Sequence, residues 1–359
     1  MKKLRIAQVA PLWFSLPPIK YGGTERIAYY LTEELVRRGH DVTLFASGDS
    51  KTSAKLVPGW PRALVHETYD GKPLSWNQPV FTLLNISMAF ERAEDFDIIH
   101  LHENAAALST FFTKLSPKPS VTTFHDPFPD EKHKDRIALL QKYKNHPFAA
   151  LSDSHRKLGE KAGVKNIHTI YNGVDTKSLP YGEGKGEYVA WLGRFAPNKG
   201  ASEAILAAQA AGKKLLLAGR LDINSSMAME YFRKDIEPHL GESVSYIGEI
   251  DDNQKTDFLG QAEALLVPIL WEEPFGLVIT EAQSCGTPVV AFRRGSTPEL
   301  VKEGETGFVV DDVEAMTDAL RKISAISRKA CREHVEKNFT IEKMAERYEN
   351  LYKEILSEQ

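Results

Sequence analysis

The chain has 359 residues, of which 42% are hydrophobic and 26% charged, and its formal net charge at pH 7 is -4. This length is enough for two domains, and the composition is ordinary for a soluble globular protein. The small acidic excess argues against a dedicated nucleic-acid binder, which would normally carry a basic excess. The two cysteines, Cys285 and Cys331, are too few for a disulfide framework and lack Cys-x-x-Cys spacing, which fits a reducing cytoplasm.

The N-terminal segment MKKLRIAQVA has weak features of a signal peptide, with two lysines before a short apolar run. Because the run is short and contains Arg5, we interpret Leu4–Ala10 as a first β-strand. No segment approaches the ~20 apolar residues that a membrane-spanning helix needs. In the next loop Trp13, Phe14 and Lys20 look exposed, which leaves two interpretations: an ordinary acceptor-side loop, or peripheral contact with the inner face of a membrane.

Short apolar runs alternate with helical stretches in the first half of the chain. The segment Thr24–Arg38 has apolar residues at helical spacing, and Gly39 follows it as a typical helix end. The strands predicted here are Leu4–Ala10, Asp41–Ser47, Asp97–His102, Ser120–His125, Phe148–Ser152 and Ile167–Gly173.

The second half repeats this alternation, with a helix predicted from about Lys199 to Ala211. Strands that alternate with helices favour parallel sheets covered on both faces, and two such blocks predict two Rossmann-like domains. The strands predicted here are Glu187–Gly193, Lys214–Gly219, Val244–Gly248, Ala264–Pro268 and Pro288–Phe292.

The boundary between the two blocks is predicted at the hydrophilic segment Asp175–Gly186, which contains Pro180 and three glycines and is typical of a linker. This gives domains at 1–174 and 175–340. The final helical stretch has an apolar face that must pack on another element, and we expect residues 341–359 to pack back on the first domain.

Ligands of open parallel sheets bind beyond the carboxyl ends of the strands, so polar or glycine-rich residues there are candidate site residues. Gly22 and Gly23 precede the first helix, where they form either a plain turn or a close approach to an anion at the helix N-terminus. They are not a dinucleotide fingerprint, because no Gly-x-Gly-x-x-Gly is present. His125 ends another strand, where it is either structural or a contact for phosphate or sugar hydroxyls.

Two cations follow the first strand of the second block. Arg194 comes directly after it, and Lys199 precedes the next helix. A lysine is unfavourable at a positive helix N-terminus unless an anion is present, so the pair indicates a diphosphate site. The alternative is a solvated pair of surface cations.

Two glutamates lie around the sequence Glu-Pro-Phe-Gly-Leu. Glu273 in the turn could accept hydrogen bonds from sugar hydroxyls, and the amides of the helix start could hold a phosphate or sugar oxygen. Glu281 lies about two turns into the helix, where a buried carboxylate needs partners. A ribose diol would supply them; a nearby Lys or Arg is the alternative.

In this order, Gly193-Arg194, Lys199-Gly200, the Glu273 and Glu281 motif, and Cys285-Gly-Thr-Pro-Val resemble the family 4 retaining glycosyltransferases, which have the GT-B fold. The resemblance covers nearly the whole chain. It implies two Rossmann-like domains facing a cleft, with the C-terminal helix crossing back to the first domain and the donor held mainly by the second.

The resemblance also implies the role of each donor-domain residue. Arg194 and Lys199 would bind the diphosphate of a nucleotide sugar, Glu281 the ribose, and Glu273 the sugar at the reaction centre. The remaining contacts would come from the amides of Phe275, Gly276 and Leu277 and, near the nucleobase, from Ile250.

In the first domain, the resemblance implies that Gly23 approaches the diphosphate and that His125 contacts the sugar or stabilises charge at the reaction centre. One departure matters: the family often has Gly-Gly-x-Pro-Glu where this chain has Gly295-Ser296-Thr-Pro-Glu. The loop at Ser296 therefore weakens any inference about which sugar is used.

No Asp-x-Asp motif follows the carboxyl end of a strand, so we expect no metal and no cofactor. Cations and helix amides would stabilise the leaving nucleoside diphosphate instead. We prefer UDP over GDP as the leaving group. The acceptor hydroxyl is left open between a sugar, a lipid-linked sugar and a small molecule. Two alternatives remain: a sugar-nucleotide epimerase of the same fold, and a non-catalytic sugar-nucleotide-binding subunit.

Overall fold

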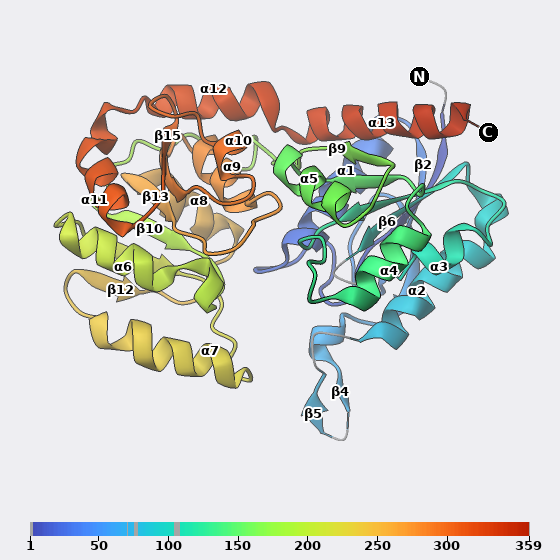
Figure 1. Ribbon diagram of the computed structural model, residues 1–359, viewed down its shortest axis with the longest axis horizontal. Coiled ribbons are helices and arrows are strands. Elements are labelled where there is room, and N and C mark those ends of the chain that lie inside the picture. The colour runs from blue at the N-terminus through green and yellow to red at the C-terminus, as the bar shows by residue number, and fades with distance from the viewer. Residues whose placement is uncertain (1–2, 70, 75–77, 104–107, 359) are drawn as a thin grey trace. The chain divides into compact units, whose positions relative to one another are not determined.

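The protein is described from a computed structural model, which covers residues 3–69, 71–74, 78–103 and 108–358. The chain packs as two compact units (Figure 1). Unit 1 consists of Met1–Gly173 together with Ile341–Gln359, and unit 2 is Val174–Thr340.

Unit 1 is built on a seven-stranded sheet whose neighbouring strands all run parallel. The strand order reverses direction between β1 and β6, which makes a topological switch point at their carboxyl ends. Across the sheet the strands are β3 (Lys55–Trp60), β2 (Asp41–Ser47), β1 (Arg5–Val9), β6 (Ile98–Glu103), β7 (Ser120–Phe124), β8 (Phe148–Ala150) and β9 (Ile167–Thr169).

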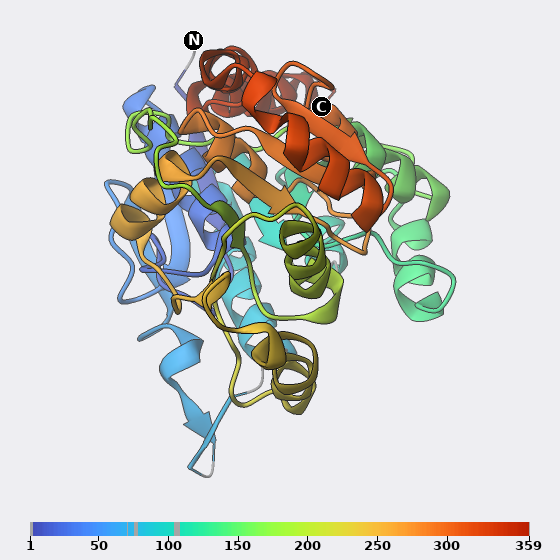
Figure 2. The same ribbon diagram turned by 90° about the vertical axis from the view of Figure 1, so that its left-hand side faces the viewer.

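Most helices of unit 1 lie between strands of this sheet in the chain, whereas α13 is the last element of the chain. A small antiparallel hairpin, β4 (Thr68–Tyr69) and β5 (Lys72–Pro73), projects from the rest of the unit in both views (Figures 1 and 2). The helices are α1 (Gly23–Arg37), η1 (Leu64–His66), α2 (Pro79–Glu91), η2 (Ala93–Asp95), α3 (Thr110–Thr113), α4 (Lys134–Lys142), α5 (Asp153–Lys161) and α13 (Ile341–Ser357).

Unit 2 has a six-stranded parallel sheet, with its switch point between β10 and β13. Its strands, across the sheet, are β12 (Val244–Tyr246), β11 (Leu215–Ala218), β10 (Val189–Leu192), β13 (Ala264–Val267), β14 (Val289–Phe292) and β15 (Gly307–Val310). Its helices are η3 (Pro197–Lys199), α6 (Ala201–Ala210), α7 (Ser226–Tyr231), η4 (Phe232–Ile236), η5 (Glu237–His239), α8 (Asp252–Gln261), α9 (Leu277–Ser284), α10 (Thr297–Leu300), α11 (Val313–Lys322), η6 (Ile323–Ala325) and α12 (Arg328–Asn338).

The short apolar runs form strands because both faces of each sheet are covered. In unit 2, Val189 and Trp191 of β10 pack with residues of α6 and α11 in one hydrophobic cluster. Successive strand residues point to opposite faces, and Ala190, which points the other way, is fully buried as well. Continuous apolar runs are the pattern expected for such strands, so the prediction of two parallel α/β sheets is confirmed.

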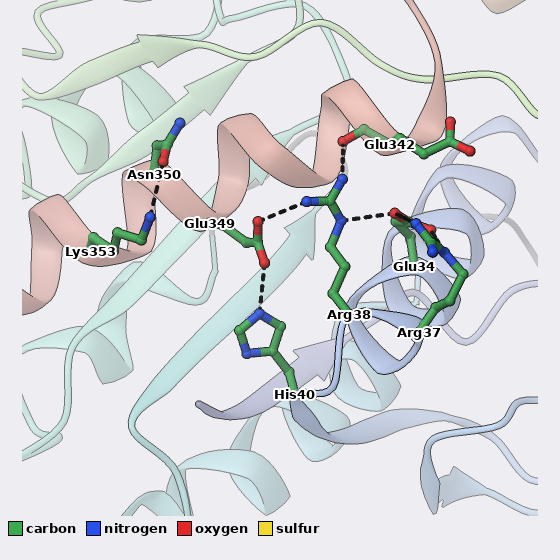
Figure 3. A network of polar contacts seen from close by, with 8 residues as sticks. All are labelled: Glu34, Arg37, Arg38, His40, Glu342, Glu349, Asn350 and Lys353. Atoms are coloured by element: carbon green, nitrogen blue, oxygen red, sulfur yellow. Dashed lines mark hydrogen bonds and ion pairs between the residues drawn. The ribbon is translucent and has the colours of Figure 1, made fainter. Parts of the chain in front are cut away.

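The C-terminal helix α13 packs on unit 1 beside α1. Its buried Glu349 accepts hydrogen bonds from Arg38 at 3.0 Å and bonds the His40 ring at 2.9 Å (Figure 3). The Arg38 guanidinium also bonds Glu34 of α1 and the backbone oxygen of Glu342 at the start of α13. These contacts hold α13 in register on the unit formed mainly by the N-terminal half of the chain.

Three local expectations need correction. The predicted linker Asp175–Gly186 is not a free connection, because the amides of Gly182, Gly184 and Gly186 donate to carbonyls of unit 2 and the backbone of Gly182 lies against that of Gly260. The strands β3 and β15 and the hairpin were not predicted. Trp13 is buried rather than exposed, because its ring packs edge-on against Phe14 in a cluster with Leu12 and Leu64.

Candidate functional site

Most of the predicted donor-side residues of unit 2 follow β10 or β13, the two strands at its switch point, whereas Ile250 follows β12. The loops after these strands are tied together, because the Leu270 amide donates to the Asn198 carbonyl at 2.9 Å. The Trp191 indole also donates to the Lys199 carbonyl at 3.1 Å. The sheet thus brings two segments distant in sequence to the one edge where an open parallel sheet binds ligands.

Lys199, Trp271 and Glu273 form a compact polar cluster at this edge. The Lys199 ammonium lies 2.6 Å from Glu273 Oε2 and 4.4 Å from the centre of the Trp271 ring. The Trp271 indole donates to the same carboxylate oxygen at 2.9 Å. The side chains of Lys199 and Glu273 are only 21% and 14% exposed, so each charge is largely shielded from water and stabilised by the other.

Gly200 explains why Lys199 can lie so close to the sheet. Gly200 has a left-handed backbone with φ 71°, and a Cβ atom there would lie 1.9 Å from the Pro268 carbonyl oxygen. Only glycine allows this approach. Lys199 ends the short helix η3, and α6 begins at Ala201, two residues later than the sequence predicts.

The turn at the start of α9 presents backbone amides beside Glu273. Gly276 is left-handed with φ 83° and precedes the first helical residue, Leu277. Within the described part of the chain, the amides of Gly276 and Leu277 have no hydrogen-bond acceptor. The Phe275 ring is buried edge-on against Phe339, so this residue could serve a ligand only through its backbone.

The loop with the unusual serine packs directly under this turn. Ser296 is fully buried, and its hydroxyl donates to the Phe275 carbonyl at 2.5 Å. Its amide donates to the Glu273 carbonyl at 3.0 Å. Gly295 lies so close that a Cβ atom would be 2.3 Å from the same carbonyl oxygen. The serine therefore adds a bond that fixes the turn, which a glycine at this position could not make.

Glu281 has a protein partner that sequence reasoning did not identify. Lys255 of α8 donates to Glu281 at 2.6 Å and also pairs with Asp252 at 3.0 Å. Glu281 and Lys255 side chains are 8% and 12% exposed. The alternative of a nearby cation is therefore what the structure shows, and the burial of Glu281 by itself does not demand a ribose. Lys255 lies in a polar helix, 26 residues before Glu281, and nothing in the sequence around it indicates this pairing.

Arg194 and Ile250 are the predicted donor residues that the structure does not join to this cluster. Arg194 is exposed in the loop after β10, and its guanidinium has no ion-pair partner among the described residues. Ile250 is partly buried in the loop before α8, next to the capping residue Asp251. In the described part of the chain, no hydrogen bond or ion pair joins either residue to Lys199, Glu273 or Glu281.

In unit 1, the predicted glycine pair begins α1, but the two glycines differ. Gly22 has φ 144°, and a Cβ atom would lie 2.8 Å from Pro18 and 3.1 Å from the Phe14 ring. At Gly23 a Cβ atom would meet nothing within 4 Å. Gly22 is thus required for the fold of the loop, whereas the space at Gly23 is open.

Glu25, two residues further, is buried in the first turn of α1. Burial raises its pKa to about 7, while hydrogen bonds from the backbone of Phe14 and of Glu25 itself oppose the shift. Its Oε1 atom has no hydrogen-bond partner. Sequence reasoning missed this acid, because nothing in the local pattern shows that the 10–22 loop covers the helix start.

His125 follows β7 and is partly buried. Its Nε2 lies 3.1 Å from Nδ1 of His102, whose Nε2 is 2.7 Å from Oε1 of Gln8. Burial lowers the pKa of His100, His102 and His125 well below its ordinary value, and positive charge on a neighbouring histidine lowers each pKa further. These rings are therefore neutral at pH 7. The sequence predicts His125 but not the two histidines behind it.

Two further features bear on possible ligands. Among the described residues, no group of three or more His, Cys, Asp or Glu side chains is arranged to hold a metal ion. In the same residues, no helix combines the length and apolar character needed to cross a bilayer.

Comparison with known protein families gives two adjacent matches. The model described as "Glycosyltransferase Family 4" matches residues 21–178, and "Glycosyl transferases group 1" matches residues 178–339. Together they span most of the chain, including every predicted site residue.

Curated relatives are similar over most of their length. A phosphatidyl-myo-inositol mannosyltransferase of Mycolicibacterium smegmatis is 29% identical over 344 residues, which cover 88% of this chain and 84% of the relative. An N-acetyl-alpha-D-glucosaminyl L-malate synthase of Bacillus anthracis is 24% identical, covering 93% of this chain and 94% of the relative.

A solved structure shares the fold. A sucrose-phosphate synthase from Thermosynechococcus elongatus superposes with a TM-score of 0.82 and 21% identity, covering 99% of this chain and 100% of that one. The expected architecture, two α/β units each with a parallel sheet, is therefore confirmed.

Proposed function

The chain belongs to the family 4 glycosyltransferases and is a transferase of the GT-B fold, and from this we propose that it moves a hexose from a nucleoside-diphosphate sugar to an acceptor hydroxyl with retention of configuration. The observation that carries the proposal is the Lys199–Glu273–Trp271 cluster beside the amides of Gly276 and Leu277. A cation, a carboxylate and helix-start amides at one sheet edge are complementary to a sugar diphosphate.

The charges of this cluster can change partners when a donor binds. An ammonium group has three donors, so Lys199 can keep Glu273 and still bind a phosphate oxygen. Glu273 accepts only, which suits the hydroxyls of the sugar. The exposed Arg194 can turn onto the diphosphate as a bidentate partner, and Glu281, with Lys255, is the candidate for the ribose.

The proposed reaction breaks the bond between the anomeric carbon and the diphosphate oxygen. Negative charge develops on the leaving diphosphate, where Lys199, Arg194 and the Gly276 and Leu277 amides stabilise it. The acceptor hydroxyl attacks from the leaving-group side and loses its proton to the departing phosphate. Because protein cations and amides serve the leaving group, we propose that no metal ion and no cofactor is required.

The named relatives indicate which donor and acceptor classes to expect. We propose UDP over GDP as the nucleotide; the relatives named above transfer mannosyl or N-acetylglucosaminyl groups by name, so either sugar is a candidate. Their acceptors differ, one a phospholipid and one a small acid, so the acceptor is proposed only as a hydroxyl compound. Peripheral contact with a lipid surface would use Ile19, 77% exposed in the loop where Trp13 is buried.

The decisive experiment combines a binding screen with a turnover assay. Thermal shift with UDP and GDP sugars should raise the melting temperature only for the true donor, because a ligand that binds the native state stabilises it. With that donor, slow release of nucleoside diphosphate is expected without an acceptor. An isomerised nucleotide sugar would instead establish an epimerase, and binding without any turnover a non-catalytic subunit. EDTA should leave the rate unchanged; a loss restored only by magnesium or manganese would contradict metal independence.

A further inference from the structure

A continuous chain of hydrogen bonds, buried except at His125 itself, lies behind His125 in unit 1. Starting from His125, it passes through His102 of β6 to Gln8 of β1. Gln8 Nε2 donates to the Tyr352 hydroxyl of α13 at 3.2 Å, and that hydroxyl lies 2.6 Å from Nδ1 of His100. The chain thus joins the central strands of the sheet to the C-terminal helix.

The members of this chain are neutral, which makes their hydrogen positions interdependent. Gln8, His100 and His102 are 0%, 0% and 3% exposed, and buried imidazoles do not hold a charge here. A neutral imidazole has one N–H and one accepting nitrogen. Fixing the hydrogen on one ring therefore fixes it on the next.

Gln8 sets the direction of the chain. Its amide nitrogen faces the Tyr352 hydroxyl, so its Oε1 faces His102 and can only accept. His102 must then carry its hydrogen on Nε2, which leaves Nδ1 as an acceptor. The only hydrogen-bond partner of that Nδ1 in the described residues is His125 Nε2, which must donate.

We propose that Gln8, acting through His102, holds His125 as the tautomer protonated on Nε2, so that its Nδ1 can only accept a hydrogen bond. Gln8 and His102 are positioning residues in this arrangement. The reverse orientation of the Gln8 amide would invert every bond in the chain and place the hydrogen of His125 on Nδ1. The Tyr352 hydroxyl can donate as well as accept, and its closest partner is Nδ1 of His100 at 2.6 Å. When the hydroxyl gives its hydrogen to that nitrogen it can only accept from Gln8, which opposes the inversion and makes Tyr352 a third positioning residue.

The chemical consequence rests on the proposed transferase function. An accepting Nδ1 can bind a hydroxyl hydrogen of the donor sugar, but it cannot donate to a phosphate oxygen. His125 would therefore recognise a sugar hydroxyl, and the charge on the leaving group would be left to the cations and amides of unit 2. Of the two ligand contacts considered for His125, a phosphate or a sugar hydroxyl, this selects the sugar hydroxyl.

The test is the nitrogen NMR spectrum of the full chain labelled with ¹⁵N-histidine, recorded near pH 7 without any donor. His125 is assigned by comparison with His125→Asn. We expect a protonated Nε2 and an unprotonated Nδ1 for His125. A protonated Nδ1, or a charged ring, would overturn the proposal. Because no donor is present, this result is independent of whether the protein transfers a sugar.

Two variants test the cause. Gln8→Met keeps the side-chain length but removes the acceptor, and Tyr352→Phe removes the hydroxyl that orients the amide; both should give mixed His125 tautomers. Thr122→Val is the matched control, because it removes a buried hydroxyl of β7 that bonds His146 and not His102. An unchanged His125 spectrum in both variants, or a change in the control as large as in Gln8→Met, would contradict the proposed chain.

A kinetic measurement extends the test to function. Once a donor is known, Gln8→Met should lower kcat/KM about tenfold, the loss typical when an outer group no longer orients a site residue. A donor lacking the recognised hydroxyl should abolish the difference between wild type and variant. If the tautomers shift as expected but kcat/KM does not change, His125 has no part in sugar recognition, and only the consequence for function fails.

Discussion

The strand-end sites of the two units use opposite electrostatic designs. In unit 2 the polar groups are charged and paired, as in Lys199–Glu273 and Lys255–Glu281, and each pair remains partly open to water. In unit 1 the groups behind His125 are neutral, fully buried and bonded to one another in series. Both sites lie at the carboxyl ends of strands in a parallel sheet, so the fold sets their place and the side chains set their chemistry.

The difference separates two tasks. Paired charges can exchange partners when an anionic ligand arrives, because the protein pair and the ligand compete for the same donors. A buried neutral network cannot exchange partners with solvent, so it fixes geometry and the positions of hydrogens. Unit 2 is therefore suited to binding and stabilising charge, and unit 1 to orienting one side chain. The following experiments test that contrast, beginning with the largest expected effect.

Replacing the central cation of unit 2 should have the largest effect. Lys199→Ala removes a proposed diphosphate ligand and leaves Glu273 with the Trp271 indole alone, so we expect transfer to fall about 10³-fold, as for loss of a preorganised charge-stabilising group. Because Glu273 then lacks its cation in a site where it is only 14% exposed, the melting temperature should fall as well, and transfer is therefore measured well below it. Lys213→Ala is the matched control, since it breaks a Lys–Glu pair of similar exposure, with Glu263, outside the cluster. Equal losses in both variants would show that Lys199 has no special role.

Breaking the more buried pair should mainly affect stability. Lys255→Met leaves Glu281 in a largely buried position without its main partner, which should lower the free energy of unfolding by roughly 4 kcal/mol. The double variant Lys255→Met with Glu281→Gln should recover most of that loss, because no charge is left unpaired. Urea unfolding measures both. If the double variant is no more stable than the single one, the pair is not the source of the effect.

Glu25 differs from the neutral network behind His125, because it is a buried acid whose pKa burial raises to about 7. The unfolded chain releases this proton near pH 4.5 and the folded chain near pH 7. Between these values the folded state binds more protons, so the free energy of unfolding should fall with rising pH, by up to about 3 kcal/mol in all. Glu25→Gln should remove this decline and be more stable than wild type at pH 8. Parallel stability curves for the two proteins between pH 5 and pH 8 would contradict the assignment.

The smallest expected effect concerns Ser296, which packs under the turn at the start of α9. Ser296→Ala removes one hydrogen bond to the Phe275 carbonyl, so we expect a loss of about 1 kcal/mol, seen as a several-fold higher donor KM. Ser296→Gly should behave similarly, with a further small cost in stability from backbone freedom. Unchanged KM in both variants would mean that the turn keeps its geometry without this bond.

Most of the fold was predictable because its signals are local. Each central strand is a short apolar run between glycines and polar residues, as in Asp41–Ser47, which was predicted with its observed bounds. The edge strand β3 was missed because Pro58 and Gly59 interrupt its pattern, and β15 because its four residues, Gly307–Val310, are short. The segment Asp175–Gly186 does follow the boundary between the two units, but it packs on unit 2, because glycines also occur where backbones pack closely, as Gly182 does against Gly260.

In the candidate site, too, residues with a local sequence signal were predictable and residues defined by distant partners were not. Lys199, Glu273 and His125 could be chosen from sequence because they stand next to glycines or strand ends. Lys255 and Gln8 could not, because a lysine on a helix and a glutamine in a strand carry no local mark of their partners, which lie 26 and 94 residues away.

The sequence by itself determined two parallel sheets and the family of transferases, because hydrophobic periodicity and strand-end motifs are written in neighbouring residues. Only the tertiary structure decided which groups share a hydrogen bond: the cation beside Glu281, the serine beneath the donor turn, and the series from Tyr352 to His125. The physical reason is that burial removes water as a partner, so each buried polar group must find one in whatever segment the fold brings against it.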